Sequence, residues 1–361
     1  EWFSSYNMVP IGLVLKMAIG GTDKYIRIKD NLTEIKKTKK KYFKLNTEQT
    51  EALKFLEKVN NKFDVSVLQG TTGSGKTLVY FERIKKIIKK NEQALVLLPE
   101  IFLTNDFKSR FEDFFGFEPA IWHSKITPKQ KRIIWKGIIN NRIRILVGAR
   151  SALLLPFKKL GIIIVDEEHD ASYKQDEGVI YNARDMAVSR ASFEKIPINL
   201  ITSVPSLETY ENIRKRKYTF SKLEQRYLNA SLPNYEIINL NLAKLQKQSW
   251  LSNEIIQKVN SHLKKKDQVL FFLNRRGFSP NVLCKKCLSS FSCPNCSINL
   301  VYHKSKNNLL CHYCGFKTSL NRSCSKKNNC DFIFSGPGVE RILEEVKKNF
   351  PSKKIEIFSS D

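Results

Sequence analysis

Short runs of apolar residues recur along the first two thirds of the chain and alternate with longer amphipathic stretches. Residues 78–90, LVYFERIKKIIKK, have apolar positions at the three- and four-residue spacing of a helix. The short runs are continuous rather than alternating, which is typical of strands buried on both faces. They are 65–69 (VSVLQ), 94–98 (ALVLL), 143–147 (IRILV), 161–166 (GIIIVD) and 198–202 (INLIT). The pattern predicts an α/β fold with a parallel sheet covered by helices.

A second region follows a change in composition. Residues 214–220 (RKRKYTF) are basic, and a new apolar run, QVLFFL, occupies 268–273. A cysteine-rich segment interrupts this region, because helix-like 341–350 and strand-like 353–358 (KKIEIF) come after it. The predicted divisions are 1–44 (N-terminal region and linker), 45–215 (first lobe), 216–283 (start of a second lobe), 284–330 (cysteine-rich insertion) and 331–361 (second lobe resumed).

Composition narrows the class of protein. A chain of 361 residues with 42% hydrophobic residues can bury the cores of about two domains. The formal net charge of +27 favours a polyanion, and nucleic acid is the leading partner, although a general abundance of lysine would also raise the charge. The most apolar N-terminal stretch, 8–20, is short and contains Lys16, so we expect a cytoplasmic protein without a membrane span. The chain begins without Met, and we expect both ends to be cut.

A phosphate-binding loop follows the first predicted strand. The sequence GTTGSGKT has the G-x-x-x-x-G-K-[ST] spacing and leads directly into a predicted helix. Its backbone N–H groups are expected to surround the β-phosphate of ATP, Lys76 to reach the β- and γ-phosphates, and the Thr77 hydroxyl to reach Mg²⁺. A glycine-rich turn without a nucleotide is the alternative. The predicted nucleotide-binding residues here are Gly70, Thr71, Thr72, Gly73, Ser74, Gly75, Lys76 and Thr77.

Two acidic residues at the end of a later strand complete the predicted catalytic set. Asp166 follows four aliphatic residues, where an acid that holds Mg²⁺ is expected, and Glu167 can orient or deprotonate the attacking water. An acidic turn exposed to solvent is the alternative for 166–170 taken alone. Together with the phosphate-binding loop, the pair predicts ATP hydrolysis with Lys76, Asp166 and Glu167 as catalytic residues.

All eight cysteines lie within 284–330. Three C-x2-C pairs are followed by two more cysteines, which suffices for two tetrahedral four-thiolate zinc sites of the structural kind. Disulfides are the alternative, and His303 and His312 are possible substitute ligands. The predicted zinc ligands are Cys284, Cys287, Cys293, Cys296, Cys311, Cys314, Cys324 and Cys330.

These features resemble the PriA family of replication-restart helicases, also called primosomal protein N′. The similar stretches, besides the motifs above, are 46–53 (NTEQTEAL), 97–104 (LLPEIFLT), 122–124 (WHS), 148–157 (GARSALLLPF), 166–187 (DEEH and an aromatic-rich loop) and 272–280 (FLNRRGFSP). The resemblance implies a superfamily 2 motor with RecA-like lobes, the second incomplete and interrupted by a zinc-binding insertion. It also implies that Gln49 reads adenine and that residues 1–20 are the end of a DNA-binding domain.

The resemblance gives the zinc sites a nested arrangement and suggests the partners. Cys284, Cys287, Cys324 and Cys330 would share one ion, and the four middle cysteines the other. It implies a 3′→5′ DNA helicase that acts at forked or single-stranded DNA, with primosome proteins and single-stranded DNA-binding protein as partners. Tyr173 and Tyr181 are expected to stack on bases, although Tyr181 could instead be a core residue. The predicted DNA contacts are Tyr173, Lys174, Tyr181, Arg184, Arg150, Arg275 and Arg276.

Several departures from the family pattern support other functions. Lys327 stands at an expected cysteine, Val204 and Val339 replace hydroxyl residues of the family motifs, and the chain stops before the motifs that supply an arginine finger. An arginine finger contributes roughly 10³–10⁵ to the rate where it has been measured, so this chain is expected to hydrolyse ATP weakly alone. The alternatives are a scaffold without motor activity that binds DNA and primosome proteins, and a superfamily 2 translocase on RNA.

Overall fold

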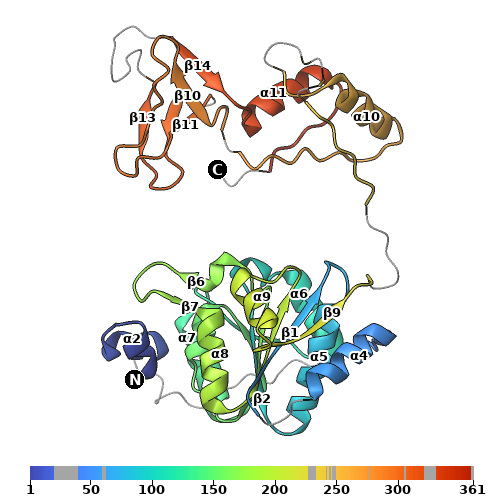
Figure 1. Ribbon diagram of the computed structural model, residues 1–361, viewed down its shortest axis with the longest axis vertical. Coiled ribbons are helices and arrows are strands. Elements are labelled where there is room, and N and C mark those ends of the chain that lie inside the picture. Colours follow the sequence, from blue (N-terminus) through green and yellow to red (C-terminus); the bar gives the residue numbers. More distant parts are fainter. Residues whose placement is uncertain are drawn as a thin grey trace. The chain divides into compact units, whose positions relative to one another are not determined.

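The computed structural model divides the chain into two compact units, Glu1–Pro233 and Asn234–Asp361 (Figure 1). It describes all residues except 20–39, 59–61, 227–232, 241, 244, 246–248, 276, 305, 321–330 and 359–361. The first unit extends beyond the boundary predicted after residue 215, because strand β9 (Thr219–Leu223) pairs with strand β1 (Asp64–Gly70) of the first lobe. The basic segment 214–217 therefore lies within the first unit.

A seven-stranded sheet with the order β3-β4-β2-β5-β8-β1-β9 forms the centre of the first unit. Every pair of neighbouring strands is parallel. Besides β1 and β9, its strands are β2 (Gln93–Leu97), β3 (Ala120–Trp122), β4 (Ile145–Gly148), β5 (Leu160–Asp166) and β8 (Pro197–Thr202). The five predicted apolar runs form β1, β2, β4, β5 and β8, which confirms the predicted α/β class.

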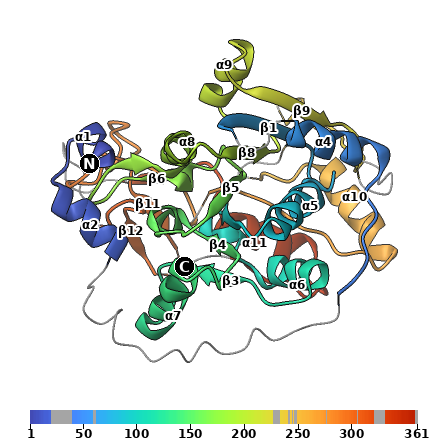
Figure 2. The same cartoon turned by 90° about the horizontal axis from the view of Figure 1, so that it is seen from below.

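Helices cover both faces of this sheet (Figure 2). One face packs against α4 (Thr47–Glu57), α5 (Lys76–Lys89) and α6 (Asn105–Phe115), and the other against α7 (Pro128–Ile139) and α8 (Ala183–Glu194). Two buried clusters result, since alternate residues of each strand point to opposite faces. The remaining α-helices among the described residues of this unit are α1 (Trp2–Tyr6), α2 (Ile11–Ile19) and α9 (Leu207–Arg214).

Local sequence signals fix where these helices begin. Asn46 and Gln49 form a capping box at α4, and Thr127 and Gln130 form another at α7, where Pro128 occupies the first turn. The Thr104 side chain caps α6. Phe3 and Met17, from the N-terminal helices, pack against the cluster on the α8 side of the sheet.

In its described residues, the second unit contains two helices and a set of short antiparallel strands. Helices α10 (Asn253–Lys264) and α11 (Val339–Asn349) share one small core. Strand β10 (Asn281–Cys284) pairs with β14 (Phe332–Ser335), while β11 (Val301–His303), β12 (Asn308–Leu310) and β13 (Lys317–Ser319) form a three-stranded sheet. No helix in the part of the chain that the structure describes is both long and apolar enough to cross a bilayer.

The strand-like run 353–358 does not form a strand, and neither does the apolar run 268–273. Phe271 and Ile355 pack against the α10–α11 core, whereas Leu270, Phe272 and Phe358 are exposed. A strand requires a partner for its backbone hydrogen bonds, and these runs have none among the described residues.

Candidate nucleotide site and cysteine cluster

The phosphate-binding loop connects the end of β1 to the beginning of α5. Gly73 (φ 84°) and Gly75 (φ 83°) adopt the left-handed backbone conformation that disfavours side chains. At Gly70 a Cβ atom would lie 2.5 Å from the Ser74 hydroxyl, so the close curl of the loop also excludes a side chain there. The loop ends at the N-terminus of α5, where free backbone N–H groups and the helix dipole favour a phosphate. The predicted loop therefore has the expected position and conformation.

Lys76 lies beside the predicted catalytic acid. Its Nζ donates a 2.7 Å hydrogen bond to the Gly70 carbonyl oxygen and lies 3.8 Å from Glu167 Oε1. The side chain is largely buried, with 9% of its surface exposed. A lysine that bonds its own loop and faces an acid can exchange these contacts for phosphate oxygens without moving far. The structure thus brings the loop and the acidic pair together.

Asp166 ends the buried strand β5, between β2 and β8. The Tyr80 hydroxyl donates to its Oδ2 at 2.9 Å, and the Glu167 N–H donates to its Oδ1 at 3.0 Å. Burial, followed by the neighbouring Glu167 charge, raises the pKa of Asp166 to about 6. The Asp166 carboxylate and the Thr77 hydroxyl are oxygen donors, the ligand type that Mg²⁺ prefers, so these residues fit that ion.

The backbone of Glu167 has φ 48°, in the left-handed region that non-glycine residues rarely adopt. Its carboxylate lies 3.4 Å from the Ser203 hydroxyl and 3.6 Å from His169 Nδ1. His169 Nδ1 in turn lies 2.8 Å from the Thr202 hydroxyl. The unusual backbone directs Glu167 toward both Lys76 and the segment that follows β8.

Gln49, the predicted adenine reader, is fully buried under the phosphate-binding loop. Its Nε2 donates to the Ser74 carbonyl oxygen at 2.9 Å, and its Oε1 accepts the Asn46 N–H at 3.0 Å. Each polar atom of the side chain therefore has a partner within the protein, and the reading of adenine by Gln49 stays a prediction. In this structure Gln49 braces the loop against α4.

Sequence reasoning missed a buried network around Glu168. Its carboxylate accepts hydrogen bonds from the Arg184 guanidinium at 3.2 Å, the Ser206 N–H at 2.8 Å and the Thr209 hydroxyl at 2.9 Å. The side chain of Glu168 has no exposed surface, and that of Arg184 is 7% exposed. The network ties the end of β5 to α8 and α9. The sequence does show that Glu168 is an acid shortly after a buried strand. It does not show the hydrogen-bond partners of Glu168, because these depend on the order of the strands in the sheet.

The aromatic-rich loop does not present the surfaces predicted for it. The Tyr173 ring is 1% exposed, and its hydroxyl donates to the carbonyl oxygens of Asp166 at 2.6 Å and Leu97 at 2.9 Å. Tyr181 is also buried and packs edge-on against Phe3, with ring centroids 5.3 Å apart. Stacking on bases requires an exposed ring face, which neither residue has. Arg184 is likewise held in the Glu168 network rather than on a phosphate-facing surface.

Other predicted DNA contacts do reach the surface. Arg150 donates to the Lys174 carbonyl oxygen, and Lys174, 62% exposed at its side chain, lies 3.2 Å from Asp176. An open hollow of about 420 Å³ is lined by Arg150, Lys174, Gln175, Asp176 and Glu177. Arg275 is exposed in the second unit, and Arg276 lies outside the described residues. DNA contact by these residues stays a prediction.

Three C-x2-C pairs adopt the same turn. The cysteine carbonyl accepts the N–H four residues on, at 2.8 Å for Leu288 and Ser297 and 2.9 Å for Gly315. These three residues all have positive φ. Each first cysteine also donates its N–H to the carbonyl five residues on. The repeated geometry presents two sulfurs on one side of each turn, as a zinc-binding knuckle requires.

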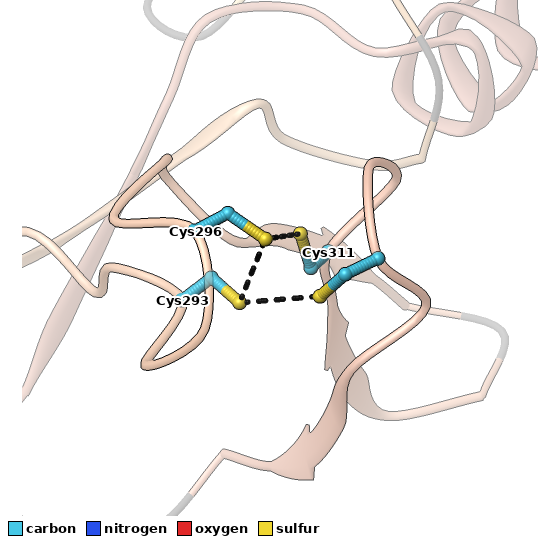
Figure 3. A group of neighbouring side chains, drawn as sticks. Cys293, Cys296 and Cys311 are labelled. Carbon is cyan, nitrogen blue, oxygen red and sulfur yellow. Dashed lines mark hydrogen bonds between the residues drawn. The ribbon is translucent and has the colours of Figure 1, made fainter. Parts of the chain in front are cut away.

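Four of the sulfurs converge within 4.8 Å of one another, those of Cys293, Cys296, Cys311 and Cys314 (Figure 3). Cys293 Sγ lies 3.8 Å from Cys296 Sγ and 3.5 Å from Cys314 Sγ, and the Cys296 and Cys311 sulfurs are 3.9 Å apart. Zinc bonded to four thiolates at about 2.3 Å would separate the sulfurs by about 3.8 Å, so the group fits zinc. A hydrogen bond with the Phe316 backbone is the main reason that the pKa of Cys314 is lowered to about 6. Hydrogen bonds with the neighbouring cysteine thiols contribute to the same shift.

The other predicted zinc site lies only partly in the described residues. Cys284 and Cys287 form the first of the three turns, whereas Cys324 and Cys330 fall within 321–330. The six described cysteines form no disulfide. His303 and His312 do not join the four-sulfur group, because their Nε2 atoms lie 3.0 Å from each other and His303 Nδ1 faces Glu340 at 3.4 Å.

The loop, the acidic pair and the parallel sheet define a P-loop nucleotide-binding lobe, followed in the chain by a cysteine ribbon. A family model described as "Type III restriction enzyme, res subunit" matches residues 42–203, and one described as "PriA DNA helicase Cys-rich region (CRR) domain" matches residues 293–318. The chain belongs to the PriA family. It is 43% identical over its whole length to replication restart protein PriA of Rickettsia prowazekii and 36% identical, over 82% of the chain, to that of Bacillus subtilis.

The chain spans 55% of the length of the Rickettsia prowazekii relative and 37% of the Bacillus subtilis one. Among solved structures, the DUF1998 helicase MrfA is similar at 20% identity with a TM-score of 0.42, over 64% of this chain and 36% of that one.

Proposed function

We propose that this chain provides the ATP-binding lobe and the zinc ribbon of an ATP-dependent 3′→5′ DNA helicase of replication restart. The observation that carries the proposal is the convergence of Lys76, Glu167 and Asp166 at the ends of two strands of one sheet. The relatives named replication restart protein PriA support the DNA-directed role.

ATP and Mg²⁺ would occupy the site between the loop and the acidic pair. The backbone N–H groups at the start of α5 would bind phosphate oxygens, and Lys76 would leave the Gly70 carbonyl for them. Thr77 and Asp166 would hold Mg²⁺, which when bound neutralises charge on the phosphates. Glu167, held 3.8 Å from Lys76, would orient the attacking water and accept its proton.

Coupling between the nucleotide and DNA would pass through the Glu168 network. Glu168 follows Glu167 directly and holds both the Ser206 N–H and Arg184. A shift of the acidic pair when the γ-phosphate leaves would therefore reach α8 and α9 through hydrogen bonds rather than loose packing. This assigns Arg184 a transmitting role in place of the predicted phosphate contact.

The cysteine segment would contribute rigidity rather than chemistry. Four thiolates close the coordination sphere of zinc and leave no position for a substrate. Two zinc ions, one in each nested site, would stiffen a region too small to bury a large core. Forked or single-stranded DNA, primosome proteins and single-stranded DNA-binding protein are the partners we propose for this region and its surroundings, in the cytoplasm.

A scaffold without motor activity is the second candidate. Val204 favours it, because the side chain is 65% exposed at a position where the family motif carries a hydroxyl. Its backbone carbonyl accepts a 2.8 Å hydrogen bond from Thr202, so the segment keeps its shape without that hydroxyl. A scaffold would bind forked DNA and ATP with no acceleration of hydrolysis by DNA.

Phosphate release from ATP, measured with and without forked DNA, tests the proposal. Lys76→Ala should abolish DNA-stimulated release, because the lysine is the cation beside the phosphates. Lys54→Ala, at an exposed position of α4, is the matched control and should behave as the unsubstituted protein. Retained stimulation in Lys76→Ala would refute the assignment of this site. Nucleotide binding with no DNA stimulation, in a protein that also carries the motifs that supply an arginine finger, would establish the scaffold.

A further inference from the structure

The edge of the sheet opposite the nucleotide site is lined with cations. Strands of a parallel sheet all begin at one edge, and the nucleotide site lies at the other, where β1 and β5 end. Loops that lead into six neighbouring strands each carry Lys or Arg close to the strand. These residues, which we term the basic edge, are Arg142 and Arg144 (β4), Lys89 and Lys90 (β2), Lys158 and Lys159 (β5), Lys195 (β8), Lys62 (β1), and Arg216 and Lys217 (β9).

Most of these charges lack an acidic partner. Within the described ranges, no ion pair involves Lys62, Lys89, Lys90, Arg144, Lys158, Lys159, Lys195, Arg216 or Lys217. Two nearby acids have other partners, since Glu211 pairs with Arg214 and Lys215, and Glu194 with Arg190. Two further acids, Glu92 and Asp64, lie at the same edge among the ten cations. The opposite edge carries the acidic segment 166–170. The positive charge is therefore concentrated on one edge of the lobe.

The central part of the basic edge is rigid. Gln93, which is fully buried, donates from Nε2 to the carbonyl oxygens of Ile138 at 3.0 Å and Ile143 at 2.8 Å. Its Oε1 accepts the N–H groups of Lys158 and Lys159, each at 2.9 Å. One amide thus fixes the loops before β4 and β5 to the start of β2, while the lysine side chains remain exposed.

A second contact holds two of the same loops together. The Asn141 side chain donates to the Asn91 carbonyl oxygen at 3.3 Å, which joins the loop before β4 to the loop before β2. Asn91 and Asn141 both have positive φ, so these are tight, defined turns. Cations on a fixed backbone lose less conformational freedom on binding than cations on a mobile loop.

We propose that the basic edge binds the phosphate backbone of a DNA duplex at a surface separate from the nucleotide site. Neighbouring strands lie about 4.8 Å apart, so six of them span about 24 Å, or about seven base pairs at 3.4 Å each. The loops before β4 and β2 expose cations and no aromatic ring, while Phe157 before β5 is partly buried and Phe63 before β1 is 41% exposed. Because cations outnumber exposed rings along the edge, phosphate contacts are favoured over base stacking. The choice of DNA as the polyanion rests on the proposed function, whereas the surface itself does not.

The test removes charge without touching the backbone that Gln93 holds. The variant Lys89→Gln/Lys90→Gln/Lys158→Gln/Lys159→Gln takes the net charge from +27 to +23, and so does the control Lys264→Gln/Lys265→Gln/Lys347→Gln/Lys348→Gln, at exposed helix ends in the second unit. Fluorescence anisotropy with a blunt 20-base-pair duplex, without nucleotide and at several salt concentrations, reports binding. Thermal unfolding of both variants checks that they fold.

The basic-edge variant should bind the duplex at least about tenfold more weakly, and the slope of log affinity against log salt should fall by about three to four. The control should change affinity by less than about threefold. Equal weakening of both variants, which would mean that only net charge matters, overturns the proposal. So does a variant that binds the duplex normally but loses binding to vesicles of anionic lipid or to a polyglutamate peptide.

Two further measurements separate this proposal from the proposed function. Binding of a fluorescent ATP analogue should be unchanged in the basic-edge variant, because Lys76 lies at the opposite edge. Conversely, Lys76→Ala should leave duplex binding in the absence of nucleotide unchanged. If the ATPase assignment fails, the duplex-binding measurement still tests the basic edge. If the basic edge does not bind the duplex, this proposal is wrong even when ATP hydrolysis is normal.

Discussion

The Tyr80 hydroxyl donates a 2.9 Å hydrogen bond to Asp166 Oδ2, which joins the helix after the phosphate-binding loop to the end of β5. Both groups are buried. The contact orients the acid proposed to hold Mg²⁺ before any ion arrives, and it favours the ionised form of that acid. Tyr80 would therefore position the proposed metal ligand in addition to packing in the core.

Tyr80→Phe should weaken Mg²⁺-dependent nucleotide binding about tenfold, because a hydrogen bond to a charged group contributes roughly 1.5–3 kcal/mol. Calorimetric titration of Mg²⁺ into the protein with a non-hydrolysable ATP analogue measures it. Tyr210→Phe, at an exposed position of α9, is the matched control and should have no effect. Nucleotide binding without Mg²⁺ should be nearly unchanged in both variants, and an equal loss there would contradict a role toward the metal.

The raised pKa of Asp166 predicts a pH dependence of stability. Its pKa of about 6 lies above the ordinary value of 3.8, so between these pH values the folded protein holds a proton that the unfolded chain releases. This group's contribution to the free energy of unfolding must then fall as pH rises from about 4 to about 6, by up to about 3 kcal/mol. Denaturant unfolding in EDTA should show this loss in the unsubstituted protein. Asp166→Asn should lack it, and parallel pH profiles for the two proteins would contradict the assignment.

Much of the nucleotide site could be predicted because its parts are local in sequence. The loop requires glycines at fixed spacing and a lysine at the start of a helix, and the sequence of residues 70–77 contains both. Asp166 was readable because a strand buried on both faces ends there. Three of the C-x2-C turns were equally local. In each case the chemistry depends on residues a few positions apart.

The features that sequence reasoning missed depend on which strands are neighbours. Arg184 was predicted to contact phosphates, but its partner Glu168 comes within reach only because β5 lies beside β8. Tyr173 was expected to be exposed, yet its hydroxyl reaches the Leu97 carbonyl at the end of β2. The basic edge likewise collects loops from residue 62 to residue 217. Burial and strand order decide these contacts, and neither is written in a local motif.

Gln93 should be a stability determinant, because one buried amide satisfies four backbone groups. Gln93→Leu would remove the amide partner of the Lys158 and Lys159 N–H groups and of the Ile143 carbonyl, whereas the Ile138 carbonyl still accepts the Asn141 N–H. The cost is about 1–3 kcal/mol for each group that is left unpaired where water cannot reach it. We expect a loss of several kcal/mol in urea unfolding of the protein. Gln225→Leu, at an exposed position, should change the free energy of unfolding by less than about 0.5 kcal/mol. Equal stability of the two variants would contradict the clamp.

The Glu168 network should matter for both stability and coupling. Glu168→Gln leaves the buried Arg184 cation with a weaker partner, and breaking such a buried pair costs about 3–5 kcal/mol. Glu208→Gln removes an acid 3.7 Å from the same guanidinium at a side chain that is 70% exposed, so it should cost less than about 1 kcal/mol. Chemical denaturation ranks the two variants, and a Glu208→Gln effect as large as that of Glu168→Gln would contradict the network.

The cysteine cluster makes a prediction that separates ligands from neighbours. Cys311→Ser should remove the zinc ion held by the middle four cysteines, because three thiolates and a hydroxyl bind zinc far less tightly than four thiolates. The adjacent His312 faces His303 and not the sulfurs, so His312→Asn should keep the full zinc content. Atomic absorption should therefore give one zinc per chain for Cys311→Ser and two for His312→Asn and the unsubstituted protein.

Limited proteolysis should cut residues 293–316 only in Cys311→Ser, since structural zinc supplies folding free energy to a small ribbon. Loss of zinc in His312→Asn would show that an imidazole, and not the fourth sulfur, completes the site.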